Sequence, residues 1–451
     1  MLSQKIGYSY NDVTIVPEVI SDIKSRSECN PYVDDKLPIF ASPMASVVSE
    51  ENYKIFEANK IIPILPRIQE YDINYRIKKM HQGWWVAVSL KELENNIIND
   101  LQTTSELNNK DYRICVDIAN GHMKYLYAEC ALAKTLARRR GINLSIMTGN
   151  IANAKTYEWI YKNALCEVEE NGHKYYDCAI DYIRVGIGGG SGCITTSNVS
   201  IHYPQASLID ECKRIKESAV CNKYVRKKPA IVADGGIRNY DHVIKALALG
   251  ADYVMIGSLF AQCIESAGIK SNKENTKIQS KFPIERYRDF EIDGNGNWWA
   301  YYTDETINHL SEPWDKEYKE AKEKYLAVFK EPEYQPEKYT ESGSEFKLIE
   351  LKYQEKIKSL KEKKYIGPID IKFFGMASAD GQKSISGKKT KTAEGITKYL
   401  PVKYTIKGWI TNMISYLCSA MSYCNCFTLN EFIGKQTLIV NSISEIHAVN
   451  K

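Results

Sequence analysis

The sequence predicts an α/β protein, a (β/α)8 barrel with an inserted helical subdomain. Short apolar runs that end in Gly, Asn, Asp or Pro alternate with helical patterns through the first 268 residues. Eight such runs occur, which is the number of strands in a (β/α)8 TIM barrel. At about residue 269 the composition shifts to Lys, Glu and Tyr, and this shift predicts a separate helical segment.

The expected barrel strands are all short and apolar. In order they are residues 37–44, 61–65, 84–88, 112–117, 144–150, 183–185, 230–234 and 253–257. Helical patterns separate most of them, for example at residues 152–163 and 240–249. We therefore divide the chain into the first part of the barrel (1–268), the insertion (269–371), and a segment expected to complete the barrel (372–451). That last segment should carry a helix at 407–421 and a short strand at 437–440.

Within the insertion, two stretches have the mixed charge and apolar spacing of amphipathic helices, residues 312–329 and 346–363. The run Asp293-Gly-Asn-Gly-Asn297 invites a calcium-loop interpretation, but such a loop needs glycine where Trp298 stands. We expect a hairpin turn there instead.

Composition excludes several classes of function. A net charge of +4 over 451 residues gives no electrostatic support for nucleic-acid binding. No apolar run approaches the ~18 residues that cross a bilayer, and the N-terminus lacks the core of a signal peptide, so we expect a cytoplasmic protein without a membrane partner. The twelve cysteines are scattered, which favours reduced thiols and no structural metal site.

The stretch from Arg184 to Thr196 carries the strongest chemical signal. Five of the seven residues from Gly186 to Gly192 are glycine, and they follow an expected strand. Such a loop leaves backbone N–H groups free to surround an anion and lets a ligand approach closely. Cys193 at its end is a candidate nucleophile, and Thr195 offers a neighbouring hydroxyl. The dinucleotide fingerprint G-x-G-x-x-G fails here because Ser191 takes the last glycine position.

Polar or glycine residues end most of the expected strands. They are Ser42, Asp117, Asn150, Cys193, Asp234 and Gly257. Parallel strands bring their carboxyl ends to one face of a barrel, so these residues should converge. The loops at Asp234–Gly236 and Gly257–Ser258 are typical of backbone phosphate sites, and Asp234 suits a ribose diol.

Four motifs, in order, resemble those of the IMP dehydrogenases and GMP reductases, a family of (β/α)8 enzymes that act at C2 of a purine nucleotide. Residues 188–196 resemble the catalytic cysteine loop, and 233–238 the ribose and phosphate loop. Residues 255–260 resemble the second phosphate loop, and 374–376 the purine-facing loop. The resemblance covers most of the chain except the insertion.

Within this family the chain is more similar to the reductases. Residues 64–84 leave no room for the regulatory domain that dehydrogenases usually carry there. No Arg follows Gly375, so the Arg that activates water in dehydrogenases is missing. Residues 117–121 resemble the reductase form of their loop, and Glu394 lies seven residues before Pro401, as the reductase glutamate does.

The resemblance implies NADPH-dependent reductive deamination of GMP to IMP and ammonia, a step of purine nucleotide salvage. Cys193 would form a thioimidate at C2, while Thr195 and Glu394 would move protons. Substrate contacts would come from Ser191, Asp234, Gly235, Gly236, Gly257, Ser258, Gly375, Met376, Ala377 and Gly395. Cofactor contacts would come from Ser25, Arg26, Arg67, Asp117, Ile118, Ala119, Ser419 and Ser422. Carbonyls of Gly188, Gly190 and Cys193 would bind a monovalent cation such as K⁺, and the enzyme would be a homotetramer.

Some residues depart from the family pattern, namely Phe373, Ala45 and the pair Pro66–Arg67. Two alternatives therefore stay open. The chain could be an IMP dehydrogenase that makes XMP with NAD, or an idle nucleotide-binding scaffold whose insertion holds a partner.

Overall fold

The computed structural model describes residues 6–103, 111–170, 173–218, 227–272, 286–328, 336–388 and 392–441. The chain forms two compact units. The first comprises Met1–Gly268, Ile371–Leu400 and Ile406–Lys451, and the second comprises Ile269–Asp370 and Pro401–Thr405.

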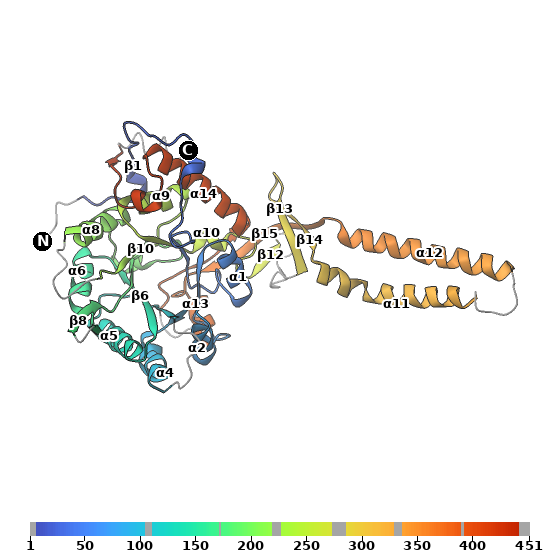
Figure 1. The fold of residues 1–451 in the computed structure, drawn as a ribbon, viewed down its shortest axis with the longest axis horizontal. Coiled ribbons are helices and arrows are strands. Elements are labelled where there is room, and N and C mark those ends of the chain that lie inside the picture. The colour runs from blue at the N-terminus through green and yellow to red at the C-terminus, as the bar shows by residue number, and fades with distance from the viewer. Residues whose placement is uncertain are drawn as a thin grey trace. The chain divides into compact units, whose positions relative to one another are not determined.

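The first unit contains a closed barrel of eight parallel strands (Figure 1). They are β2 (Ile39–Ala41), β3 (Ile62–Leu65), β4 (Trp85–Val88), β5 (Asp111–Val116), β6 (Asn143–Ile151), β9 (Tyr182–Val185), β10 (Ala230–Asp234) and β11 (Tyr253–Ile256). Each strand pairs with the next, and β11 pairs back onto β2. All eight fall within or beside the expected runs, so the predicted (β/α)8 TIM barrel is confirmed.

Large side chains fill the barrel interior. Phe40, Trp85 and Met255 are buried there, and Tyr182 and Tyr253 pack against them. The rings of Phe40 and Trp85 meet edge to face, 5.6 Å apart. Strands that are buried on both faces need continuous apolar sequence, which is the pattern that predicted them.

Helices surround the barrel and connect its strands (Figure 1). They are α1 (Glu50–Ala58), α2 (Ile73–His81), α3 (Leu90–Glu92), α4 (Ile98–Thr103), α5 (Lys124–Arg139), α6 (Ala154–Asn163), α7 (Thr195–Val199), α8 (Gln205–Ser218), α9 (Tyr240–Leu249) and α10 (Ser258–Ala261). A π-helical turn, η3 (Leu93–Ile97), joins α3 to α4, and an antiparallel hairpin, β7 (Leu165–Glu170) and β8 (His173–Cys178), follows α6. The sequence analysis did not predict that hairpin.

The topology corrects one expectation, that residues 372–451 complete the barrel. The barrel already closes between β2 and β11, so no later strand has an open edge to join. The late residues form α13 (Ala379–Ser386), β16 (Thr397–Pro401), α14 (Ile406–Tyr423), α15 (Leu429–Phe432) and β17 (Leu438–Val440). The N-terminal region forms η1 (Tyr10–Asp12), β1 (Val13–Ile15) and η2 (Arg26–Glu28), and β1 pairs antiparallel with β17.

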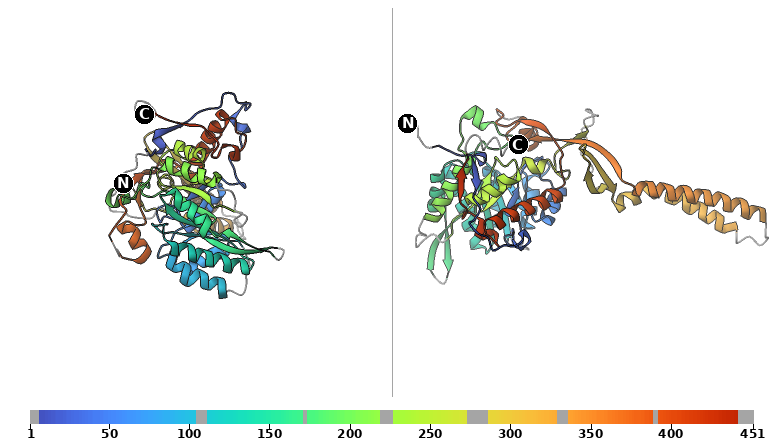
Figure 2. Two further views of the ribbon diagram at one scale, coloured as in Figure 1. Left: turned by 90° about the vertical axis from the view of Figure 1, so that its left-hand side faces the viewer. Right: turned by 90° about the horizontal axis from the view of Figure 1, so that it is seen from above.

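The second unit combines a small sheet with a long helix pair. Its sheet has the order β12 (Lys270–Asn272), β15 (Lys364–Phe374), β14 (Asn297–Tyr302) and β13 (Tyr287–Ile292), and β16 pairs with β15. The helices α11 (Asp304–Val328) and α12 (Pro336–Lys361) run side by side in Figure 1 and in the right-hand view of Figure 2. The two helices were expected, whereas the sheet around them was not.

The expected hairpin turn at residues 293–297 is confirmed, since β13 and β14 pair antiparallel on either side of it. One oxygen of Asp293 accepts the N–H groups of Asn295 and Asn297, both at 2.9 Å. The other accepts the indole N–H of Trp299 at 3.3 Å. These bonds, led by the one from Asn297, lower the pKa of Asp293 to about 2.

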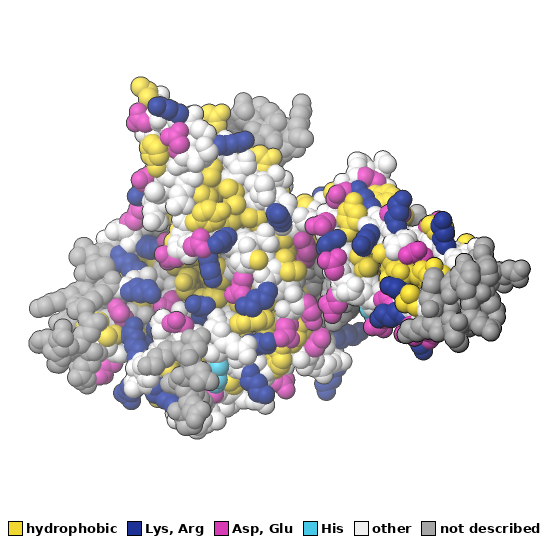
Figure 3. All heavy atoms as spheres, turned by 45° about the vertical axis from the view of Figure 1, so that its right-hand side comes forward, with side chains coloured by type: hydrophobic (Ala, Val, Ile, Leu, Met, Phe, Trp, Pro, Cys, Tyr) yellow, Lys and Arg dark blue, Asp and Glu magenta, His cyan; other side chains and the backbone are white. Residues whose placement is uncertain are grey.

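Stacked aromatic rings join α11 to α12. Tyr325 stacks on Phe346 with ring centres 5.0 Å apart, and Tyr318 stacks on Tyr353 at 4.7 Å. On the face in Figure 3, Lys and Arg side chains are interspersed with Asp and Glu, so neither sign gathers into a continuous patch there. This mixture agrees with the small net charge of the chain.

Candidate active site

A cavity of about 830 Å³ opens at the carboxyl ends of the barrel strands. Its walls come from the loops after β2, β5, β6, β9, β10 and β11, and from two late segments, residues 373–377 and 394–395. This is the face on which (β/α)8 enzymes carry their chemistry. The described residues that line the cavity all belong to the first unit.

The glycine-rich loop after β9 needs its glycines for two reasons. Gly186 and Gly188 have φ values of +130° and +79°, which side chains rarely adopt. At Gly192 the reason is space, because an added Cβ would lie 3.0 Å from the backbone nitrogen of Gly375. The loop can therefore run directly against the late segment 373–377.

Backbone hydrogen bonds connect the cysteine loop to Glu394. The N–H of Ile194 donates to the carbonyl of Glu394 at 3.1 Å, and the N–H of Ile396 donates to the carbonyl of Gly192 at 2.9 Å. Glu394 in turn donates its own N–H to the carbonyl of Ala377 at 3.1 Å. These bonds bring a carboxylate to the cysteine loop from a position about 200 residues later in the chain.

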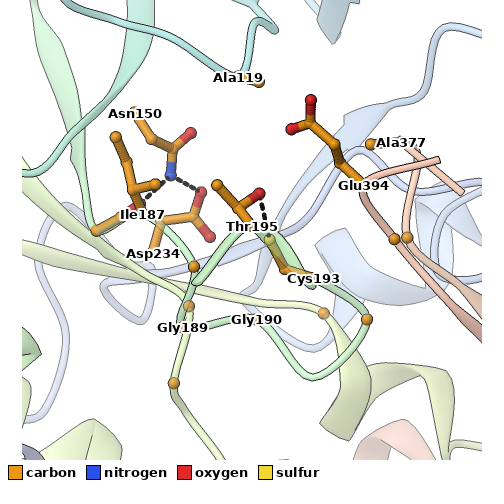
Figure 4. Close-up of a pocket in the computed structure, with 18 of the residues that line it drawn as sticks. Ala119, Asn150, Ile187, Gly189, Gly190, Cys193, Thr195, Asp234, Ala377 and Glu394 are labelled. Atoms are coloured by element: carbon orange, nitrogen blue, oxygen red, sulfur yellow. Dashed lines mark hydrogen bonds between the residues drawn. The ribbon is translucent and has the colours of Figure 1, made fainter. Parts of the chain in front are cut away.

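Cys193 and Thr195 form a direct contact in the cavity (Figure 4). The thiol of Cys193 donates to the hydroxyl oxygen of Thr195 at 3.1 Å. The side chain of Glu394 extends into the same space (Figure 4). A half-buried thiol, a hydroxyl that can take its proton and a nearby carboxylate have the chemistry of nucleophilic catalysis with proton transfer.

Asp234 faces the cavity from the end of β10 and is held by two neighbours. The side-chain amide of Asn150 donates to it at 2.7 Å, as Figure 4 shows, and Arg184 lies 3.8 Å away. Arg184 also donates to Asp117 at 3.0 Å. Burial raises the pKa of Asp234, and Arg184 and Asn150 oppose that rise.

The sequence analysis named Arg184 as the start of the glycine-rich stretch but predicted no role for its side chain in the site. It is the charged residue of an otherwise apolar strand, and its side chain is only 4% exposed. A charge at such a position needs partners, so this exception to the apolar pattern was a usable signal. Other cavity residues were missed as well, among them the two histidines His122 and His202. His122 follows the loop that the resemblance assigned to the cofactor, so its position could have been inferred. Nothing in the sequence indicated that His202 would line the cavity.

The structure gathers the predicted substrate residues into one place. All ten line the cavity together with Cys193, Thr195 and Glu394. Ser191 has a buried hydroxyl without a hydrogen-bond partner among the described residues. Buried polar groups are nearly always paired, so this hydroxyl is suited to a ligand oxygen.

The predicted cofactor residues do not all meet. Ala119 lines the cavity, and Asp117, two residues before it, contacts Arg184. Asp117 itself does not line the cavity, and neither do the other six, which are Ser25, Arg26, Arg67, Ile118, Ser419 and Ser422. Four of these lie on η2, on its N-cap or on α14, two elements linked by the contact of the Cys418 sulfur with the Cys29 carbonyl at 3.7 Å.

Two of the three carbonyls predicted to bind a cation already accept hydrogen bonds. The Gly188 carbonyl accepts from the hydroxyl of Thr196 at 3.2 Å, and the Gly190 carbonyl accepts from the N–H of Cys193 at 3.0 Å. Across the described ranges, no three His, Cys, Asp or Glu side chains gather as metal ligands. The helices in those ranges include none that is both long and apolar enough to span a membrane.

Comparison with known proteins agrees with this geometry. The family model of the IMP dehydrogenase / GMP reductase domain matches residues 96–283. A GMP reductase of Staphylococcus epidermidis is 30% identical over 285 residues, which cover 61% of this chain and 77% of the relative. A GMP reductase of Leptothrix cholodnii is 30% identical over 270 residues, covering 58% and 73%. A GMP reductase of Mesoplasma florum is 28% identical over 286 residues, covering 61% and 79%.

Proposed function

The chain belongs to the IMP dehydrogenase / GMP reductase family, and from this premise we propose that it is an NADPH-dependent GMP reductase. The reaction would be GMP with NADPH and two protons giving IMP, NADP⁺ and ammonium. Family membership supports an oxidoreductase that acts on a nucleotide with a nicotinamide cofactor. The choice of GMP and of NADPH is our proposal.

One observation carries the proposal: the Cys193 thiol donates to Thr195 beside the backbone-anchored Glu394. The Thr195 hydroxyl can accept the thiol proton while it passes its own proton on, and we propose Glu394, a carboxylate in the same cavity, as the group that receives or returns it. General acid–base groups held in this way contribute about 10²- to 10⁴-fold in rate.

We propose the following sequence of events. The sulfur of Cys193 adds to C2 of GMP, and protons relayed through Thr195 and Glu394 reach the amino group as its bond to C2 breaks. Ammonia leaves, and a thioimidate remains on Cys193. The nicotinamide cofactor, when bound, supplies a hydride to C2. The C2–sulfur bond then breaks, which restores the thiolate and releases IMP.

The cavity supports a mononucleotide as the substrate. Asp234 can accept hydrogen bonds from two ribose hydroxyls, and the unpaired hydroxyl of Ser191 can donate to a phosphate oxygen. Among the described residues that line the cavity there is no Lys or Arg, so a phosphate there would depend on backbone N–H groups such as those of Gly236 and Ser258. Gly375 and Met376 would face the base.

The remaining proposals follow from family resemblance. Asp117 and Ala119 would meet the nicotinamide half of the cofactor, and Ser25, Arg26, Ser419 and Ser422 its other half. We also propose a cytoplasmic homotetramer. Two of the three carbonyls that the resemblance assigns to a K⁺ site have partners within the chain.

The test follows nicotinamide absorbance with the purified full-length protein. We expect loss of NADPH with GMP and no formation of NADH from IMP and NAD⁺. Formation of NADH with IMP would instead establish a dehydrogenase. Silence in both assays, together with measurable GMP binding, would establish a nucleotide-binding scaffold.

A further inference from the structure

The carbonyl groups of the glycine-rich loop are bonded by donors from this same chain. Five carbonyls accept such bonds: Gly186 from the Asn150 amide (2.8 Å), Ile187 from the His202 ring (2.8 Å), Gly188 from the Thr196 hydroxyl (3.2 Å), Gly190 from the Cys193 N–H (3.0 Å) and Gly192 from the Ile396 N–H (2.9 Å). The loop that carries Cys193 is therefore fixed by side chains and backbone of the folded chain.

Thr196 makes the bond that bears most directly on a cation site. Its hydroxyl lies so close to Gly188 that an added Cβ there would be 2.0 Å from the Thr196 oxygen. A hydroxyl that donates to a carbonyl points its positive hydrogen at that oxygen. The hydroxyl occupies one of the two lone pairs of that oxygen, and a cation approaching the same oxygen would meet a like partial charge.

Gly190 leads to the same conclusion. Its carbonyl accepts the N–H of Cys193, three residues on, in a tight turn at the nucleophile. The carbonyl donor set expected from resemblance is therefore poorly suited to a monovalent cation, because two of its three oxygens already use one lone pair in a bond that holds the loop in shape. Neutral hydrogen-bond donors of this chain therefore hold these carbonyls in place, as a bound cation would.

We propose that Thr196 is a positioning residue that takes the place of a monovalent cation at the Gly188 carbonyl, so that the cysteine loop keeps its working shape without K⁺. The proposal deepens the proposed function, because that loop presents the nucleophile. Thr196 acts through Gly188 and is not assigned a contact with substrate. Removing only the hydroxyl of Thr196 tests this proposal, because a purely apolar packing role of the side chain would not depend on that group.

The first test measures the rate at which iodoacetamide alkylates Cys193, in KCl and in choline chloride at equal ionic strength. It needs no substrate, so it stays interpretable even if the protein does not reduce GMP. Alkylation is assigned to Cys193 by peptide mass analysis. We expect the wild-type rates in the two salts to agree. A wild-type rate that changes when K⁺ is removed overturns the proposal.

The second test uses Thr196→Val, which keeps the shape of the side chain and removes the donor. In choline chloride its alkylation rate should differ from wild type by about three- to tenfold, the range expected for one lost hydrogen bond. KCl should return it toward wild type, because a cation can then occupy the vacated carbonyl. A rate equal to wild type in choline, or an altered rate that KCl does not restore, overturns the proposal.

Two control variants complete the design. Thr196→Ser keeps the hydroxyl and should behave as wild type in both salts. Ser197→Ala removes the neighbouring hydroxyl, which bonds to the Ile194 carbonyl and is absent from the cavity wall, and should also leave the rate unchanged. If Thr196→Val does not fold, Thr196→Ala replaces it. If the alkylation rate of either control variant depends on the salt, the effect is not specific to loss of the Thr196 hydroxyl, and the proposal is overturned.

Discussion

Residues that meet in the active-site cavity come from distant parts of the chain, whereas those that meet between α11 and α12 come from one continuous segment. Cys193 and Glu394 are joined through backbone bonds of three separate loops. Tyr318 and Phe346, by contrast, belong to two helices that follow one another directly. Distant contacts depend on the whole fold, and local ones mainly on their own segment.

The two regions should therefore respond differently to substitution. In the cavity the backbone carries the geometry, so exchanging one side chain should alter chemistry while the fold survives. In the helix pair the side chains themselves make the contact, so exchanging one should loosen the segment and leave the chemistry unaffected.

Cys193→Ala should break the chemistry completely. Activity should fall by at least about 10³-fold, because the nucleophile acts as part of a unit and nothing else in it forms the covalent bond. The melting temperature should stay the same, since the bonds of Ile194 and Gly192 are backbone bonds. Initial rates and thermal unfolding measure both quantities. Activity close to wild type would refute the assignment of the nucleophile.

Glu394→Gln should lower kcat by about 10²- to 10⁴-fold and leave KM for GMP nearly unchanged. Its backbone bonds to Ala377 and Ile194 remain, while the proton-transfer group is lost. The matched control is Glu355→Gln on the exposed side of α12, which should change neither constant. A large rise in KM without a fall in kcat would instead give Glu394 a binding role.

Asp234→Asn should weaken GMP binding by about tenfold to a hundredfold, the cost of losing a charged hydrogen-bond acceptor. Burial raises the pKa of Asp234 in the free protein, so the wild-type carboxylate should take up a proton at a higher pH than an ordinary aspartate. GMP affinity should therefore fall as pH drops through that raised pKa. Calorimetric titration across pH would detect it, and the same slope in the Asn variant would contradict the assignment.

Phe346→Ala tests the other side of the comparison. The ring stacks on Tyr325 and Tyr318, and losing two aromatic pairs should destabilise the helix pair by about 1–3 kcal/mol. Hydrogen exchange should quicken in α11 and α12 while kcat and KM stay the same. Leu348→Ala, at a side chain that is 54% exposed, is the control and should have a smaller effect. Lost activity would show that the two regions are coupled.

Asp293→Ala should have the smallest effect, a local loosening of the β13–β14 turn. The folded pKa of about 2 lies below the ordinary value, so ionised Asp293 stabilises the turn fully above that ordinary value. This contribution is lost as pH falls through about 2. Trp299 donates to Asp293, so its fluorescence should report the acid transition in the wild type. The same transition in the Ala variant would contradict this account.

Much of the fold could be predicted because the barrel strands are buried on both faces and so appear as uninterrupted apolar runs. The approach of Glu394 to Cys193 could not be derived from spacing, since it depends on backbone bonds between loops about 200 residues apart; only the family resemblance linked them. The β7–β8 hairpin and β13 of the second unit were missed because their strands are partly exposed and interrupted by charged residues.

The predicted substrate residues and the predicted cofactor residues also differ in how well the sequence could place them. Motif residues that directly follow barrel strands, such as Asp234 and Gly257, do line the cavity. Ser25 and Ser419 lie outside the strand–loop pattern, and no local rule could say where they would end up. The bond from Thr196 to Gly188 was also beyond the sequence, since it depends on the turn that carries α7 back over the loop.

The chain leaves the barrel at Gly268 and returns at Ile371, two residues so close that a Cβ on the glycine would lie 2.5 Å from the isoleucine side chain. A connection whose ends meet is tolerant of length, because each doubling of a flexible loop costs only about 0.6 kcal/mol in closure entropy. This junction can therefore accept cassettes of very different size. Evolution could exchange the module it holds, and a protein engineer could graft a foreign domain there without redesigning the catalytic face.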